Sequence, residues 1–263
     1  MNTWLFPPQS QEIQFDEKWS FVAKKEKHCD RDCAADDDKG DQWDHLAIDA
    51  ESRLIISVVP GRRTTASCLA LLEEVKAKTG GRTNLFFTSD EHASYETAIA
   101  KVYNVAPPES TGQVSKDSTQ SEEPCPPELC YATVRKTRKQ GRVIEIVTTL
   151  VMGVVSLLAS YLKRSSVSNT INTSFVERQN GTDRGQNSRK IRKTYGFSKK
   201  FDVHHAMTYF SLYSYNFCWP VRTLTIQDGQ QKIKRTPAMA AGLTDHIWSL
   251  EEWVTYPMIM NSQ

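Results

Sequence analysis

Three acidic residues occupy positions where a carboxylate could bind a metal ion or take part in catalysis. Asp16 lies within an alternating, strand-like stretch at 13–22, Asp90 follows the short apolar run 85–88, and Glu177 lies in a polar stretch that favours a helix. Carboxylates from a strand, a strand end and a later helix can converge on one point. Such a cluster supplies the oxygen ligands that Mg²⁺ or Mn²⁺ prefers, and two such ions can promote cleavage of a phosphodiester.

Each of these residues also has an ordinary structural interpretation. Asp16 could face solvent from the polar side of its strand, since an unpaired charge buried in a strand is costly. Asp90 could cap the helix expected after it. Glu177 could form a surface ion pair with Arg178 or Arg184. The pattern alone leaves both interpretations open for all three acids.

The charge of the chain is unevenly distributed. The 263 residues carry a net charge of +2, yet residues 1–60 hold 13 acidic and 7 basic residues, and residues 131–203 hold 15 basic and 4 acidic ones. A basic segment in a chain with candidate catalytic acids indicates a polyanionic partner. A solvated charged face is the alternative. The basic residues that we expect to contact phosphates are Arg62, Arg63, Arg189, Lys190, Arg192 and Lys193.

Composition excludes several classes of protein. With 39% hydrophobic and 24% charged residues, the chain is typical of a globular protein and unlike a disordered, collagenous or coiled-coil one. Its first residues lack the pattern of a secretory signal, and six cysteines are too few for a disulfide scaffold. We therefore expect a cytoplasmic protein. The apolar stretch 146–162 is short for a membrane span and favours a buried strand that leads into a buried helix.

The cysteines do not predict a zinc site. His28, Cys29 and Cys33 form one group, and Cys125 and Cys130 form another, but both spacings are loose for structural zinc and both groups lie in expected insertions.

Hydrophobic periodicity predicts an α/β protein. The order begins with a three-strand meander and continues with strand–helix alternation, which indicates a mixed sheet with helices on its faces. Two insertions interrupt it. The first, at about 24–44, is highly charged and reads as a solvated hairpin; the second, at about 106–165, begins with a Pro/Ser-rich loop and includes a basic turn at 135–142. The expected strands are 13–22, 45–48, 54–59, 85–88 and 129–134, and the expected helices are 64–78, 93–103, 175–193 and 204–216.

Five strings along the chain occur in an order and spacing that are fairly specific together. They are FDEKWSFV at 15–22, HLAIDAESRLIISVVPGRRT at 45–64, TSDEHASY at 88–95, SFVERQNGTDRGQNSRK at 174–190 and GFSKK at 196–200. In these strings the chain resembles the catalytic part of the insertion-sequence-one family of DDE transposases, in the ribonuclease H-like (retroviral integrase) superfamily. The resemblance covers about 13–217, with gaps.

This resemblance implies a function and a set of site residues. Asp16, Asp90 and Glu177 match the family's acidic triad, which implies a ribonuclease H-like fold, Mg²⁺ or Mn²⁺ as cofactor, and cleavage and strand transfer of an insertion sequence's DNA. Asn180 and Arg184 match positions one and two turns after the glutamate, on the same helix face, and by this resemblance would bind and orient DNA or support Glu177. Asp49 is a rival first acid, but it lies at a hairpin turn, where Asp commonly makes local hydrogen bonds. The implied protein acts on element ends and target DNA at the nucleoid, as a homo-oligomer on DNA.

The chain departs from the family pattern in two ways. The segment between Asp90 and Glu177 is longer than in compact members. The expected division is an extension at 1–12, a catalytic domain at 13–217 and a tail at 218–263, so the helix-turn-helix region that reads element ends is expected to be missing or separately encoded. Two alternatives follow: an inactive or truncated DNA-binding remnant, and a metal-dependent nuclease of the same fold.

Overall fold

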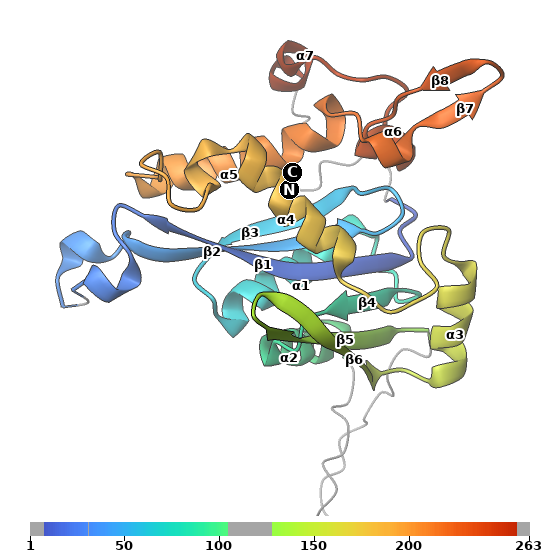
Figure 1. Ribbon diagram of the computed structural model, residues 1–263, viewed down its shortest axis with the longest axis horizontal. Coiled ribbons are helices and arrows are strands. Elements are labelled where there is room, and N and C mark those ends of the chain that lie inside the picture. Colours follow the sequence, from blue (N-terminus) through green and yellow to red (C-terminus); the bar gives the residue numbers. More distant parts are fainter. Residues whose placement is uncertain (1–7, 31, 105–127, 257–263) are drawn as a thin grey trace, which may run out of the picture.

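A six-stranded mixed sheet with helices alongside forms the body of the protein (Figure 1). The computed structural model describes residues 8–30, 32–104 and 128–256. The strands lie in the order β3-β2-β1-β4-β5-β6. Their bounds are β1 Glu12–Val22, β2 Gly40–Asp49, β3 Ile55–Gly61, β4 Phe86–Ser89, β5 Cys130–Lys139 and β6 Arg142–Met152. The prediction of an α/β protein with a mixed sheet is confirmed.

The first three strands form an antiparallel meander, and β4 and β5 then add parallel to β1. Strand β6 turns back antiparallel on β5. Because side chains of a strand alternate between its two faces, β1 sends Ile13 and Phe15 into one core and directs Gln14, Asp16 and Lys18 to the opposite face.

Helices cover both faces of the sheet. The helices α1 (Thr65–Lys78) and α2 (Ala93–Tyr103) pack over Ile13, Phe15 and Phe87 in the larger core. The helices α4 (Ser174–Gln186) and α5 (Phe201–Cys218) lie on the other face, with Val176 and Leu212 against β2 and β3. The helix α3 (Val155–Arg164) packs beside Phe86 of β4.

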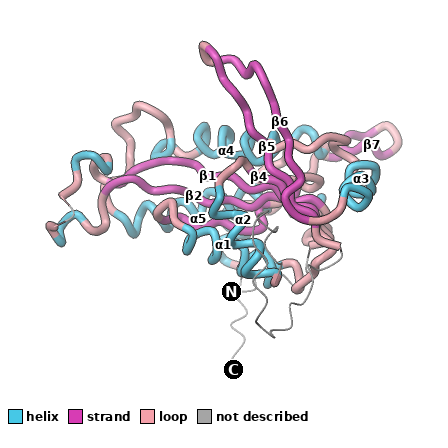
Figure 2. The backbone as a smooth tube through the Cα atoms, turned by 90° about the horizontal axis from the view of Figure 1, so that it is seen from below, coloured by secondary structure: helices cyan, strands magenta, loops and turns pink. Residues whose placement is uncertain are grey.

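The β5–β6 hairpin differs most from prediction. The expected basic turn at 135–142 is instead the distal half of two paired strands, which turn at Gln140 and Gly141, both with positive φ. This hairpin extends beyond the body of the protein (Figure 2). Ile144 and Ile146 are therefore 60% and 59% exposed, and the prediction of a buried strand here is wrong. The expected loop at its start falls largely on residues 105–127, which lie outside the described residues.

Helix boundaries and the first insertion also differ from prediction. The expected helix at 175–193 ends at Gln186, because Asn187 is extended and its side chain caps a short 3₁₀ turn, Ser188–Lys190. The insertion after β1 contains two more 3₁₀ turns, Glu26–His28 and Ala34–Asp36, and β2 begins before its end. Not all of its acids are solvated, since Asp36 and Asp44 are buried.

The tail after α5 folds into small elements. They are the 3₁₀ turn Arg222–Leu224, the hairpin of β7 (Ile226–Asp228) and β8 (Gln231–Ile233), and the helices α6 (Pro237–Ala240) and α7 (Leu250–Thr255). Ser249 caps α7 by accepting the Glu252 N–H. Within the described parts of the chain, no helix combines the length with the apolar character that crossing a bilayer requires.

Candidate active site

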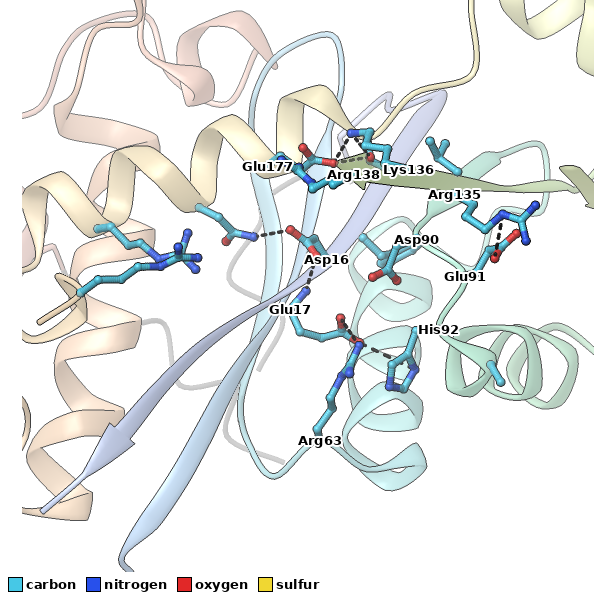
Figure 3. A pocket seen from close by; sticks show the side chains of 17 residues that line it. Asp16, Glu17, Arg63, Asp90, Glu91, His92, Arg135, Lys136, Arg138 and Glu177 are labelled. Carbon is cyan, nitrogen blue, oxygen red and sulfur yellow. Dashed lines mark hydrogen bonds and ion pairs between the residues drawn. The ribbon is translucent and has the colours of Figure 1, made fainter. Parts of the chain in front are cut away.

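A polar cleft of about 770 Å³ receives all three predicted carboxylates (Figure 3). Asp16 comes from β1, Asp90 follows the end of β4, and Glu177 lies on α4. A strand, a strand end and a helix thus bring acids from three distant parts of the chain to one cleft. The remaining lining residues are Phe15, Glu17, Arg63, Glu91, His92, Ala93, Val134, Arg135, Lys136, Arg138, Thr173, Asn180, Arg184 and Arg192.

Asp16 is held in place from both of its oxygens. Its Oδ1 accepts the Glu17 N–H at 2.9 Å, and its Oδ2 accepts the Asn180 side-chain amide at 2.8 Å. Burial and the charge of Asp90 together raise the pKa of Asp16 to about 6, against the lowering effect of the Asn180 hydrogen bond. A bound cation would offset the like-charge repulsion that contributes to this shift.

Glu17 is a third acid at the centre that the sequence reasoning missed. Asp16, Glu17 and Asp90 each place an oxygen within 4.8 Å of the others. Among the described residues, Oε1 of Glu17 and Oδ1 of Asp90 are buried without a hydrogen-bond partner. Strand alternation sends Glu17 to the opposite face from Asp16, which argued against it. Its adjacency in sequence to Asp16 was the only available signal.

Glu177 lines the cleft, but its carboxylate is paired with a lysine. Its carboxylate pairs with the Lys136 ammonium and accepts the Thr173 hydroxyl at 2.7 Å. The sequence does not single out Lys136, because the basic run at 135–142 predicts a turn. In the observed strand, alternation places Lys136 and Arg138 on the same face, and both line the cleft.

Gln14 fixes the start of the helix that carries Glu177. Its Oε1 accepts the N–H groups of Phe175 at 3.0 Å and Val176 at 3.2 Å, and its Nε2 donates to the Asn172 carbonyl at 2.9 Å. The first N–H groups of a helix have no partner within the helix, so a side-chain acceptor stabilises them. A residue of β1 thereby orients α4.

A buried ion-pair network also attaches α4 to β1. The Lys18 ammonium pairs with Asp183 of α4 and lies 3.2 Å from Asp44, and all three side chains are at most 3% exposed. The Lys190 ammonium bonds both oxygens of Asp44 at 2.8 Å. Lys190 is 3% exposed, so it is not available for the phosphate contact that the sequence predicts for it.

The other predicted basic residues fall into two groups. Arg63, Arg184 and Arg192 line the cleft, and the Arg63 guanidinium lies 4.9 Å from the centre of the Trp43 ring. Arg62 instead secures the first insertion, through Glu26 at 2.5 Å and the carbonyls of residues 37 and 39. Arg189 and Lys193 do not line the cleft. Arg135, Lys136 and Arg138, which sequence reasoning did not select, do.

Asp49 has the local role expected of a turn residue. It accepts the Ser52 N–H at 3.1 Å and the Ser52 hydroxyl, and it does not line the cleft. The structure therefore separates Asp49 from the carboxylates that surround Asp16.

Comparison with known proteins adds nothing to this geometry, because no protein-family model matches the sequence and the search of curated proteins finds no match.

Proposed function

We propose that the protein is a DDE transposase with a ribonuclease H-like catalytic domain, which cleaves the DNA of an insertion sequence and joins its end to a target. The observation that carries the proposal is the convergence of Asp16, Asp90 and Glu177 on one cleft. The antiparallel meander followed by two strands parallel to β1 supports it, because the resemblance implies this order.

The acids of the cleft fit Mg²⁺ or Mn²⁺. Asp16 and Asp90 offer close oxygen atoms, and Oδ1 of Asp90 is buried without a partner among the described residues. Hard divalent cations take such ligands. Asp16, Asp90 and Glu177 would hold the ions, which supply charge stabilisation at the attacking and leaving oxygens of a phosphodiester. Lys136 pairs with Oε1 of Glu177, so an ion at that oxygen would displace the ammonium.

Basic residues around the same cleft fit the DNA backbone. Arg135, Lys136 and Arg138 line one side on β5, and Arg184 and Arg192 line the cleft with them. Guanidinium groups match phosphate geometry, and such contacts supply affinity independent of sequence. The hairpin of β5 and β6 projects outward, so DNA in the cleft would also lie along this arm (Figure 2).

The test of this proposal is Glu177→Ala. A duplex oligonucleotide with the element's terminal sequence and a free 3′-hydroxyl is incubated with a supercoiled plasmid and Mg²⁺, and joined products are counted. We expect DNA binding to change less than threefold and joining to fall by at least about 10²-fold, because a ligand for the reacting centre is lost. Glu73→Gln, an exposed acid of α1 outside the cleft, is the matched control.

Two results would contradict the proposal. Unchanged joining by Glu177→Ala would remove Glu177 from the site. Nicking without any joining by the unaltered protein would assign it to the metal-dependent nucleases of this fold instead.

A further inference from the structure

A second group of ligating side chains lies buried behind the cleft. Glu17 of β1, His45 of β2 and Cys68 of α1 each offer one ligand atom, and these atoms lie within 4.8 Å of one another. His45 and Cys68 are 0% exposed, and the side chain of Glu17 is 1% exposed. An oxygen, a nitrogen and a sulfur atom therefore meet between the sheet and its first helix.

His45 presents an unpaired nitrogen to this group. Its Nδ1 lies 3.1 Å from the Val59 carbonyl oxygen, which can only accept a hydrogen bond, so Nδ1 carries the proton. The neutral ring then has its lone pair on Nε2, and Nε2 is buried without a hydrogen-bond partner among the described residues. A histidine that binds a metal characteristically donates its other N–H to a carbonyl or carboxylate in this way.

Glu17 contributes a second unpaired buried atom, its Oε1. Arg63 approaches the other oxygen at 3.6 Å. His92 lies 3.8 Å from Oε1 (Figure 3). Its Nδ1, however, already accepts the Ser94 N–H. A buried polar atom without a partner costs about 1–3 kcal/mol. Two such atoms, from neighbouring strands and close to one thiol, indicate a binding partner for the group.

Cys68 supplies the softest ligand. It lies near the start of α1, where the helix dipole favours a thiolate. Without a cation, burial raises the pKa of the thiol to about 12, because the charged form is poorly solvated there. A cation beside the sulfur supplies the missing charge compensation.

We propose that Glu17, His45 and Cys68 bind one zinc ion. Nitrogen and thiolate ligands favour zinc over Mg²⁺, which takes oxygen ligands almost alone. The ion would join β1, β2 and α1 beside the cleft. Because Glu17 also lines the cleft, the ion would fix the wall against which the catalytic acids rest. This inference goes beyond the proposed function and does not depend on it.

The test uses the full chain, stripped of metal with a chelator and titrated with Co²⁺ as a spectroscopic substitute for zinc. With excess Mg²⁺ present to occupy the cleft, we expect one equivalent of Co²⁺ to bind and to produce the near-ultraviolet charge-transfer absorption of a thiolate–Co²⁺ bond. Zinc should displace the cobalt, and a hundredfold excess of Mg²⁺ should not. Cys68→Ser should abolish the absorption, and His45→Gln should weaken cobalt binding at least tenfold.

Matched variants separate this site from other thiols and from the catalytic centre. The double variant Cys29→Ser/Cys33→Ser removes the thiols of the first insertion and should retain the absorption, as should Asp16→Asn. Circular dichroism checks that each variant is folded. No thiolate absorption, or absorption that survives in folded Cys68→Ser, would overturn the zinc proposal. Neither result would alter the joining assay for Glu177.

Discussion

Replacing Lys18 with methionine should strongly destabilise the protein, although Lys18 does not line the cleft. The substitution keeps the length of the side chain and removes a fully buried ammonium that pairs with Asp183 and lies 3.2 Å from Asp44. Asp44 keeps a cation, because both of its oxygens remain bonded to Lys190 at 2.8 Å. Among the residues that the structure describes, the Asp183 carboxylate then keeps the Ser211 hydroxyl, at 3.0 Å, as its hydrogen-bond partner.

The expected loss of unfolding free energy is that of leaving one buried carboxylate, Asp183, without a cation. Removing one partner of a buried ion pair costs about 3–5 kcal/mol of unfolding free energy. In a protein of this size each kcal/mol lowers the midpoint of thermal unfolding by roughly 2–4 °C, so Lys18→Met should lower it by roughly 10 °C. Urea unfolding followed by tryptophan fluorescence measures the free energy, and circular dichroism measures the thermal midpoint.

A second substitution tests the cause. Lys18→Met combined with Asp183→Asn removes both charges and leaves an acceptor for Ser211, so it should recover more than half of the lost free energy. Lys232→Met, at an exposed position on β8, is the control and should change the free energy by less than about 0.5 kcal/mol. A loss below 1 kcal/mol in Lys18→Met, or a double variant no more stable than the single one, would refute the reasoning.

Three further substitutions test other buried polar groups. Burial raises the pKa of Glu12 from 4.5 to about 7, so the stability of the native protein should fall as pH rises across this interval, by at most about 3 kcal/mol. Glu12→Gln should flatten that fall in urea titrations at pH 4.5 and 7.5, and parallel curves for the two proteins would contradict the assignment. Gln14→Ala should cost about 1–2 kcal/mol and speed hydrogen exchange at Phe175, because the start of α4 loses its acceptor; unchanged exchange there would exclude this role. Asn216→Ala should cost about 2–5 kcal/mol in urea unfolding, since Asn216 bonds both the N–H and the carbonyl of Ile55 at 2.9 Å, and a loss under 1 kcal/mol would count against it.

The sequence predicts those parts of the fold that local pattern controls. The alternation at 13–22 gives β1, and Thr64 caps the following helix by accepting the Ser67 N–H. Asp16, Asp90 and Glu177 all line the cleft, and each lies within a string that carries the family resemblance.

The sequence does not predict contacts that depend on distant partners. Lys190 stands in a basic run that resembles a phosphate-binding surface, yet its partner Asp44 lies 146 positions away and draws it into the interior. Lys136 and Arg138 have low strand propensity, and only pairing with β6 makes them part of a strand. The place of Glu17 between two groups of ligands follows from how β1, β2 and α1 pack.

The bonds between β1 and α4 also determine when the site can exist during synthesis. The pairs of Gln14 with Asn172, Asp16 with Asn180, and Lys18 with Asp183 span 158, 164 and 165 positions. The meander of β1, β2 and β3 can form early from local contacts, but its polar face must then wait for α4. At about 5–20 residues per second, this wait is on the order of 10–30 s. During that interval Lys18 and Asp16 have no helix above them, so a nascent chain has a sheet but no assembled cleft.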